Sequence, residues 1–330
     1  MKIENLTTCT GCSACYSVCG KNAIIMTEND EGFLYPKIEK SKCVECGLCE
    51  KVCSAIMPLA NNNNFRKTLS GFHKNEDIRL ESSSGGIFTA FAEKIIEENG
   101  VVFGAKFADD FSVIHSWTET KDGLADFRGS KYLQSVIGNT YKECESFLKQ
   151  GRTVLFTGTP CQIQGLKKFL RKEYLNLYTI DFFCHGVPNN ALWQKYIDYI
   201  CDKTNNSRQD IVRISFRRKL HGWKNFCLSF SFSDGSEYSE PQLNGAWMLA
   251  FNKNKMMRES CYQCPSKGCN IVSDITIGDF WGSQYYLNSS DEKGLSIFLV
   301  NTDSGVSMVE AVSDKLALTE IVNYDVLKYK

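Results

Sequence analysis

Two cysteine runs with the same spacing constrain this chain more than any other feature of its sequence. The first, CTGCSACYSVC, begins at Cys9, and the second, CVECGLCEKVC, begins at Cys43. Both read C-x2-C-x2-C-x3-C, a spacing that lets three thiolates of one tight loop meet three irons of a 4Fe–4S cube while the fourth cysteine points away. Paired C-x2-C motifs also make zinc sites, but zinc gives no reason for a third and a fourth cysteine at identical spacing.

The repeat also predicts how the two runs combine. In two-cluster ferredoxins the fourth cysteine of each run binds the cluster of the other run. Between the runs, AIIMTENDEGFLYPKI predicts two short strands around a turn at residues 29–32, as the two-fold ferredoxin fold requires. We therefore predict a two-cluster 4Fe–4S ferredoxin domain in residues 1–58, with two ligand sets. One set is Cys9, Cys12, Cys15 and Cys53, and the other is Cys43, Cys46, Cys49 and Cys19.

Composition supports a metal or redox role for these cysteines. The chain of 330 residues has 16 cysteines, and its start, MKIENLTTC, lacks the basic and apolar regions of a signal peptide. No apolar run reaches the ~18–20 residues that a membrane span needs, so we expect a cytoplasmic protein, in which thiols stay reduced. Basic and acidic side chains balance at 38 each, which gives no reason to expect nucleic acid or an acidic membrane surface as a partner.

After residue 58 the sequence changes character. Residues 59–70 contain four consecutive asparagines and predict a linker. In residues 71–330, SGGIFTAFAEKIIEENG, TYKECESFLKQG and ALWQKYIDYICDKT predict helices, whereas VVFGAKF, TVLFTG, LYTIDFFC, DITIGDFWG and LSIFLVN predict strands. RISFRRK and FCLSFSFSDGSEY alternate as in a β-hairpin. The predicted fold class is an α+β ferredoxin-like two-cluster module followed by a larger mixed α/β domain.

The other eight cysteines divide by their context. Three lie within helical or strand patterns and are expected to be buried as small apolar side chains: Cys144, Cys201 and Cys227. Cys161 and Cys184 instead follow predicted strands, and the carboxyl ends of strands in an α/β sheet meet at the edge where cofactors bind. CYQC adds a C-x2-C pair, so four thiols are available for a third cluster. From spacing alone, zinc or a ligand set that includes Cys269 remains an alternative.

The motifs of residues 71–330 carry a family resemblance. They read, in order, SSSGGIFTAFA, RGSKYLQS, FTGTPCQIQGLKKFL, DFFCHGVP, ISFRRKLHGW, CYQCPSKG and SDITIGDFWG. With the two cysteine runs before them, the chain resembles the beta-subunit family of coenzyme F420 hydrogenases and dehydrogenases over nearly its whole length. The resemblance implies an iron–sulfur flavoprotein that carries FAD and a 4Fe–4S cluster in the larger domain. It also implies the ligands of this third cluster: Cys161, Cys184, Cys261 and Cys264.

The resemblance places FAD near the SSGG and GTP motifs. The candidate FAD-binding residues lie in three segments: Ser83, Ser84, Gly85 and Gly86; Lys131 and Tyr132; and Thr157, Gly158 and Thr159. SSGG opens a predicted helix, where free backbone N–H groups and the positive end of the dipole would hold a pyrophosphate. In GSKY, Lys131 would reach a phosphate and Tyr132 a ring. A plain Ser/Gly helix N-cap and a solvated loop are the corresponding alternatives.

Two more polar segments have alternative interpretations. FRRKLHGWK, residues 216–224, is either a charged hairpin tip or an anion site for substrate or flavin phosphate. Asp279, between apolar neighbours in IGDFWG, is either held by backbone N–H groups or bonded to a flavin ring edge.

The predicted function follows from this cofactor set. Iron–sulfur clusters move one electron at a time, whereas flavin accepts two. We predict a ferredoxin-fused iron–sulfur flavoprotein oxidoreductase that passes electrons between 4Fe–4S clusters and FAD, and on to or from a small-molecule or deazaflavin-like acceptor. The expected partner is a redox protein or a small-molecule electron acceptor. The alternatives are an electron-transfer subunit whose substrate chemistry is on a partner protein, and a zinc-stapled binding module without a redox role.

Overall fold

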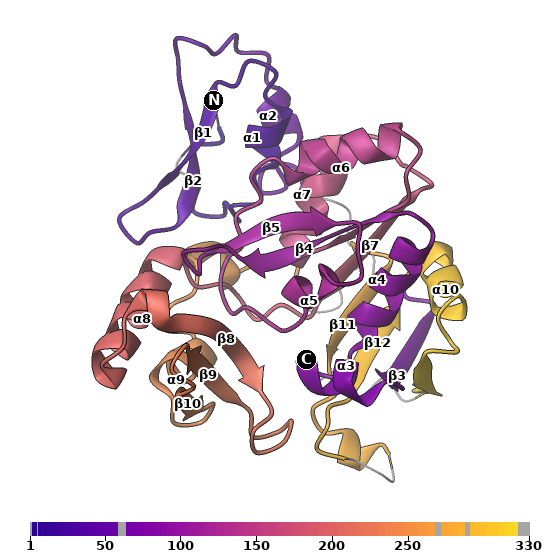
Figure 1. The fold of residues 1–330 in the computed structure, drawn as a ribbon. Coiled ribbons are helices and arrows are strands. Elements are labelled where there is room, and N and C mark those ends of the chain that lie inside the picture. Colours follow the sequence, from indigo (N-terminus) through magenta and orange to yellow (C-terminus); the bar gives the residue numbers. More distant parts are fainter. Residues whose placement is uncertain (1, 5, 59–63, 268–271, 288–290, 323–330) are drawn as a thin grey trace.

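The computed structural model describes residues 2–4, 6–58, 64–267, 272–287 and 291–322. Within these ranges the strands form three sheets, of two, three and eight strands (Figure 1). None of the helices in the described ranges combines the length and the apolar character that crossing a membrane requires.

The two-stranded sheet lies in residues 2–58, which we call the N-terminal region. β1 (Ile24–Glu28) pairs antiparallel with β2 (Leu34–Ile38), which confirms the two strands that the sequence predicts between the cysteine runs. Each run contributes one short helix, α1 (Ala14–Val18) in the first and α2 (Leu48–Lys51) in the second. The repeat in the sequence is therefore also a repeat in the structure.

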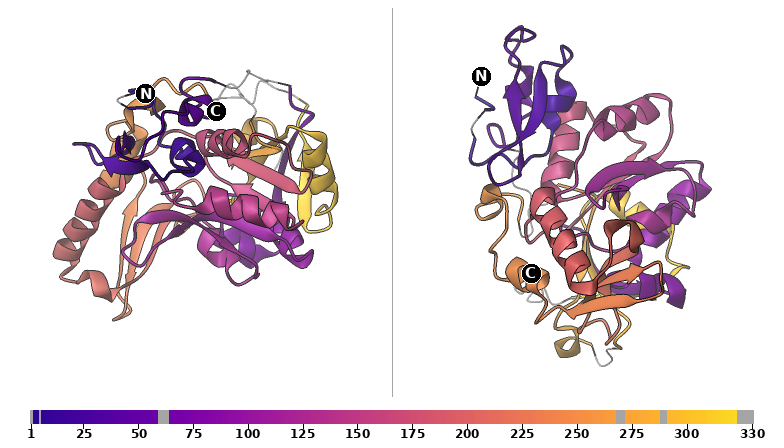
Figure 2. Two further views of the ribbon diagram at one scale, coloured as in Figure 1. Left: turned by 90° about the horizontal axis from the view of Figure 1, so that it is seen from above. Right: turned by 60° about the vertical axis from the view of Figure 1, so that its left-hand side comes forward.

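The N-terminal region packs closely on the rest of the chain. α1 contacts α6 (Thr140–Lys149) and α7 (Pro160–Leu170), and Figure 2 shows the N-terminal region beside these helices. Three of its apolar side chains join the core between α6, α7 and the large sheet: Ala14, Val18 and Val52. The first cysteine run is thereby held close to the start of α7.

The three-stranded sheet forms a separate antiparallel layer. Its strands, in the order β10-β9-β8, are β8 (Ile211–Arg218), β9 (Cys227–Phe232) and β10 (Glu237–Pro241). α8 (Asn190–Thr204) and α9 (Ala246–Asn252) cover it, and Trp193 and Trp247 are fully buried between the layers. The predicted hairpin is confirmed.

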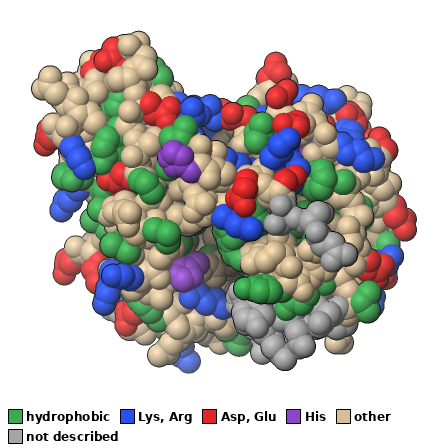
Figure 3. All heavy atoms as spheres, turned by 90° about the horizontal axis from the view of Figure 1, so that it is seen from below, with side chains coloured by type: hydrophobic (Ala, Val, Ile, Leu, Met, Phe, Trp, Pro, Cys, Tyr) green, Lys and Arg blue, Asp and Glu red, His purple; other side chains and the backbone are tan. Residues whose placement is uncertain are grey.

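On the face shown in Figure 3, acidic and basic side chains are interspersed, in line with their equal numbers.

The eight-stranded sheet organises the rest of the chain. Its order is β13-β3-β12-β11-β7-β6-β4-β5. Its strands are β3 (Lys67–His73), β4 (Val101–Phe107), β5 (Val113–Thr118), β6 (Val154–Thr157), β7 (Leu177–Phe182), β11 (Ile275–Asp279), β12 (Ser296–Val300) and β13 (Leu316–Glu320). β4, β6, β7 and β11 run parallel, and the other pairings are antiparallel. The carboxyl ends of the four parallel strands therefore meet at one edge, as expected for an α/β sheet.

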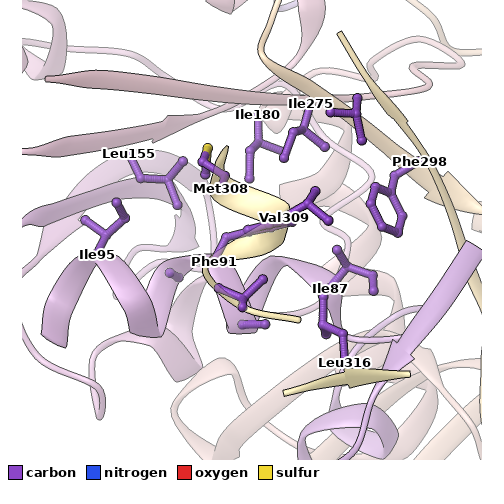
Figure 4. Close-up of a cluster of buried hydrophobic side chains, with 14 of the residues drawn as sticks. Ile87, Phe91, Ile95, Leu155, Ile180, Ile275, Phe298, Met308, Val309 and Leu316 are labelled. Carbon is purple, nitrogen blue, oxygen red and sulfur yellow. The ribbon is translucent and has the colours of Figure 1, made fainter. Parts of the chain in front are cut away.

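Helices cover both faces of this sheet. The remaining helices are α3 (Glu76–Glu81), α4 (Ile87–Glu97), α5 (Leu124–Phe127), α10 (Asp303–Glu310) and the 3-10 turns η1 (Arg208–Asp210), η2 (Glu259–Cys261) and η3 (Ser283–Tyr285). α4 and α10 pack on one face, where Phe91, Met308 and Leu155 of β6 belong to one buried apolar cluster (Figure 4). α6 and α7 pack on the other face, where Tyr141 and Ile163 are fully buried.

The structure differs from the sequence predictions at β3, which lies between β13 and β12 in the large sheet. The sequence predicts a linker over residues 59–70, but residues 67–70 pair with β12 as the first part of β3. Four consecutive residues of β3, Thr68–Gly71, are buried, so the strand lacks the alternation that marks a half-exposed strand. Residues 59–63 of the predicted linker lie outside the described residues.

Candidate functional site

The first cysteine run and one cysteine of the second line a common cavity. Its volume is about 370 Å³, including space open to solvent, and we call it the N-terminal cavity. Its thiols come from Cys9, Cys12, Cys15 and Cys53. The structure therefore gathers the four cysteines that the crossed ferredoxin pattern assigns to one cluster, although Cys53 is far from the others in sequence.

The backbone around both runs is shaped to bind an anion. The residues on either side of the second cysteine have positive φ in each run: 69° and 61° at Gly11 and Ser13, and 54° and 70° at Glu45 and Gly47. Alternating left- and right-handed residues turn successive N–H groups toward one point, an arrangement common at phosphate and iron–sulfur sites. The same turn at both runs fits two clusters of the same kind.

The remaining ferredoxin cysteines lie nearer to solvent. Cys46 is exposed, Cys43 and Cys19 are half-buried, and Cys49 is buried. Backbone N–H groups point at two of these sulfurs: Ala23 donates to Cys19 Sγ at 3.3 Å, and Glu45 donates to Cys43 Sγ at 3.4 Å. N–H donors to sulfur stabilise a thiolate, as a cluster ligand requires.

Four later cysteines line a second cavity, at the carboxyl edge of the large sheet. Its volume is about 470 Å³, including space open to solvent, and we call it the sheet-edge cavity. Its thiols come from Cys161, Cys184, Cys261 and Cys264. Cys161 begins α7 after β6, and Cys184 follows β7, so adjacent parallel strands bring them to one place. Cys261 ends η2 and reaches the same cavity from a loop.

Burial makes both cavities unfavourable for a bare thiolate. It raises the pKa of Cys12 to about 11 and that of Cys184 to about 12. Burial also raises the pKa of Cys161, with a further contribution from the neighbouring Cys184 and Cys264. A positive metal centre would reverse this preference, because it stabilises the thiolates and releases their protons.

The two cavities are neighbours. Thr10 lines both of them. α7 also connects them, since it carries Cys161 at its start and, one turn later, Gly165 against Cys12. A Cβ on Gly165 would lie 3.0 Å from Cys12 Cβ and 3.1 Å from Cys12 Sγ. The sequence motifs do not reveal this contact, because it joins residues about 150 positions apart.

Zinc and Cys269 are the alternatives that the sequence leaves open at the sheet-edge cavity. In the described ranges, no three His, Cys, Asp or Glu side chains converge as ligands of a single metal ion would. Cys269 lies outside the described residues. The three cysteines predicted to be buried without a ligand role are buried: Cys144, Cys201 and Cys227.

The candidate flavin residues of SSGG and GSKY lie beside each other. Ser130 N donates to Ser83 Oγ at 2.6 Å, which joins the two segments. Ser84 Oγ donates to the Leu295 carbonyl at 2.7 Å, and Gly85 N donates to Ser296 Oγ at 3.0 Å. These groups therefore have partners within the protein. Gly86, with φ of 82°, is the N-cap of α4, and no side chain caps this helix.

The side chains of Lys131 and Tyr132 in the GSKY motif are also anchored. Lys131 Nζ donates to the carbonyls of Asp126 and Arg128, at 2.6 and 3.0 Å, and burial lowers its pKa to about 7. Tyr132 Oη accepts from Arg217 Nη1 at 3.1 Å. Lys131 is therefore directed at backbone carbonyls, not at solvent as in the alternative of a solvated loop.

Thr157, Gly158 and Thr159 connect the end of β6 to α7. Thr159 caps α7, and its Oγ1 lies 3.1 Å from Cys161 Sγ, so it lines the sheet-edge cavity. The Thr157 carbonyl accepts from His115 Nε2 at 2.8 Å. The other ring nitrogen of His115 must then accept from Ser135 Oγ, at 2.8 Å, and burial lowers the pKa of this histidine to about 4.

The segment at residues 216–224 folds inward, so the interpretation as a charged hairpin tip is wrong for its buried members. Arg217 is 5% exposed and makes a two-point ion pair with Asp279, with both N–O distances at 2.9 Å. Trp223 is fully buried and donates from Nε1 to the same carboxylate at 2.8 Å. Asp279 is thus held by two side chains, a partnership that the sequence does not reveal.

Comparisons with known proteins cover both parts of the chain. Residues 151–323, more than half of the chain, match the family model for the C terminus of the coenzyme F420 hydrogenase/dehydrogenase beta subunit. Residues 8–55 match a 4Fe–4S dicluster domain, a match that includes both cysteine runs. The N-terminal region is therefore a 4Fe–4S dicluster domain.

Individual relatives cover the chain to different extents. The chain is 25% identical over 184 residues to the coenzyme F420-dependent sulfite reductase of Methanocaldococcus jannaschii. The match covers 54% of this chain and 28% of that protein, so the chain spans less than a third of that relative's length. In fold it is similar to a chain of the F420-reducing [NiFe] hydrogenase complex from Methanosarcina barkeri. The two structures superpose with a TM-score of 0.57 and are 18% identical in sequence. The match covers 82% of this chain and 90% of the hydrogenase chain.

Proposed function

Because the chain belongs to the coenzyme F420 hydrogenase/dehydrogenase beta-subunit family, we propose that it is an iron–sulfur flavoprotein oxidoreductase with a fused ferredoxin domain. It would pass electrons between 4Fe–4S clusters and FAD, and on to or from a small-molecule or deazaflavin-like acceptor. The names of two relatives support this choice, since one is called F420-dependent and the other F420-reducing.

The observation that carries the proposal is the contact between the two cysteine cavities. Each is lined by four thiols, Thr10 lines both, and α7 runs from Cys161 to the backbone packed on Cys12. Four thiolates in one cavity fit a 4Fe–4S cluster, which supplies one-electron transfer when bound. Two such sites in direct contact are useful for moving electrons between a surface and a buried centre.

The backbone around the cysteines of each cavity is suited to a negatively charged cluster. At the N-terminal cavity the positive φ values of Gly11 and Ser13 form an anion-binding turn around Cys12. At the sheet-edge cavity, Cys161 lies in the first turn of α7, where the positive end of the helix dipole favours a thiolate. Both sites therefore fit a negatively charged cluster held by cysteine.

The second ferredoxin set gives the route to solvent. Cys46 is exposed, whereas each of the four sheet-edge cysteines is only half-buried and none is exposed. We propose that a redox partner protein or a small-molecule electron acceptor approaches at this end. Electrons would then travel through the N-terminal cavity toward the sheet-edge cavity, or in the reverse direction.

FAD is proposed at the junction of the SSGG, GSKY and TGT segments. The N-terminus of α4 lacks a side-chain cap, so its first N–H groups are suited to an anion. Arg128 lies beside that turn, with its Nε 3.2 Å from Thr89 Oγ1, and adds positive charge. When bound, FAD would supply two-electron chemistry next to the one-electron sites. The chain's own groups would hold the phosphates and orient the ring.

A substitution at Cys161 tests the third cluster. In anaerobically purified full chain, Cys161→Ser should remove about four irons and leave the two ferredoxin clusters, since the N-terminal ligands are separate. Iron, sulfide and flavin analysis would measure this loss. Cys144→Ala is the matched control, because Cys144 is fully buried in α6 away from both cavities.

Two outcomes would contradict the ligand set. Cys161→Ser that keeps all its iron would show that Cys161 binds none. Cys269→Ala that loses as much iron as Cys161→Ser would favour Cys269 as the fourth ligand.

The second candidate function is an electron-transfer subunit whose substrate chemistry takes place on a partner protein. The hydrogen bonds already made by Ser84 Oγ and Gly85 N favour it, because they leave these groups without a free donor for a pyrophosphate. The similar fold in a hydrogenase complex also favours it. Full chain that purifies with its iron but without flavin, and does not take up added FAD, would support this alternative.

A further inference from the structure

Arg258 is a fully buried cation at the contact between the N-terminal region and the rest of the chain. It precedes Cys261 by three residues. Its guanidinium donates from Nε to the Cys9 carbonyl at 2.7 Å and from Nη2 to the Leu34 carbonyl at 3.0 Å. Nη1 lies 3.1 Å from Gln134 Oε1, and the amide of Gln134 in turn donates to the Thr10 carbonyl at 2.8 Å. One side chain thus ties the first cysteine run and the strand after it to the protein body.

The charge of Arg258 has no carboxylate partner in the described residues. The other two buried arginines do have one: Arg79 pairs with Asp291 and Arg217 with Asp279. The neighbour of Arg258 in sequence, Glu259, is exposed. Arg258 instead stacks on the Tyr35 ring, 4.1 Å from its centroid. A buried charge that meets only neutral acceptors is costly unless a counter-charge lies close by.

The two cysteine cavities lie on either side of this charge. Cys9, whose carbonyl Arg258 binds, lines the N-terminal cavity. Cys261, whose N–H donates to the Arg258 carbonyl at 2.8 Å, lines the sheet-edge cavity. A cube ligated by four thiolates carries net negative charge, so a cluster in either cavity would supply the missing counter-charge.

We propose that Arg258 is a positioning residue that acts as the shared counter-charge of the two adjoining clusters and holds the first cysteine run against the protein body. The inference rests on the proposed function, because it requires both clusters. A positive charge beside a cluster favours the added electron, so Arg258 raises the reduction potential of both clusters. The cluster of Cys43, Cys46, Cys49 and Cys19 does not depend on it.

The test is a potentiometric titration of the loaded full chain, followed by electron paramagnetic resonance. Arg258→Met removes the charge and keeps most of the volume. We expect the reduction equilibrium constant to fall roughly tenfold at both adjoining clusters, which for one electron is about 59 mV. Arg258→Lys keeps the charge but not the forked contacts. It should leave both potentials near those of the unaltered protein while hydrogen exchange near Cys9 and Leu34 increases.

Lys267 provides a matched control with a different expected pattern. It lines the sheet-edge cavity but not the N-terminal one. Lys267→Met should therefore lower the reduction potential of the sheet-edge cluster alone. Arg258→Met should lower the reduction potentials of both adjoining clusters.

The outcomes separate this inference from the proposed function. If the unaltered protein holds no cluster at the sheet-edge cavity, the proposed function fails. If it holds all three clusters and Arg258→Met leaves every potential unchanged, the counter-charge role is wrong. Should Arg258→Met fail to load clusters, Arg258→Lys decides: unchanged potentials support the role, and potentials lowered at both adjoining clusters overturn it.

Discussion

Gly165 offers a direct test of the contact between the two cavities. It lies in the interior of α7, where alanine is normally preferred to glycine by roughly 0.5–1 kcal/mol. A Cβ at this position would stand 2.9 Å from Tyr141 Oη, 3.0 Å from Cys12 Cβ and 3.1 Å from Cys12 Sγ. Tyr141 is fully buried and donates to the Gln162 carbonyl at 2.7 Å, so it has little freedom to move aside.

These two effects oppose each other, and their sizes decide the sign. Inserting a methyl group into a packed core costs typically about 1–3 kcal/mol. Subtracting the gain in helix propensity leaves a net destabilisation of roughly 1 kcal/mol for Gly165→Ala. Cys12 is the neighbour that is able to yield, so we also expect reduced iron occupancy at the N-terminal cavity.

Chemical denaturation and iron analysis of Gly165→Ala would measure both effects. Gly20→Ala is the control, because a Cβ on Gly20 meets nothing within 4 Å. A Gly165→Ala protein that is more stable than the unaltered one, with full iron, would refute the close packing of α7 on Cys12.

Two further predictions concern pH and metal removal. Burial raises the pKa of Asp181 from 3.8 to about 7. The folded protein therefore keeps its full stability with respect to this group below pH ~4 and loses stability as the pH rises through 7. Asp181→Asn should remove this pH dependence. In denaturation experiments at pH 8 it should raise the free energy of unfolding by as much as about 4 kcal/mol. Unchanged pH dependence in Asp181→Asn would count against this. Removing iron with a chelator should increase hydrogen exchange across residues 6–58 but not in the eight-stranded sheet, because Cys15 and Cys49 are themselves part of the small N-terminal core. Equal protection with and without iron would argue against a structural role for the clusters.

Local spacing determined much of the N-terminal region. The two cysteine runs, the strands between them and the pairing of Cys53 with the first run follow from a pattern that repeats within 53 residues. The helices α4 and α6 and the parallel strands of the large sheet were also predicted, because their apolar residues recur with a strong helical or strand pattern. β3 and β13 were not predicted because these strands are defined by their partners, and β3 pairs with β12 and β13, more than 200 residues away in sequence.

The candidate sites depend more on tertiary structure. Strand-end position suggested that Cys161 and Cys184 would meet, but no spacing rule relates them to Cys261 and Cys264; the family resemblance supplied that link, and the fold brings the four to one cavity. The sequence offered alternatives for residues 216–224 and Asp279. The choice between them required the ion pair of Arg217 with Asp279, which joins two different sheets.

The sequence by itself thus determined that the N-terminal region is a two-cluster ferredoxin domain and which other residues are candidates for the chemistry, since residue type and local spacing can be read along the chain. Only the tertiary structure decided that the two cysteine cavities touch, through Thr10, Gly165 and Cys12, and that Arg258 lies between them without a carboxylate partner in the described residues. The physical reason is that such contacts and charges act across space, between groups whose distance is set by how helices and sheets pack and not by their separation in sequence.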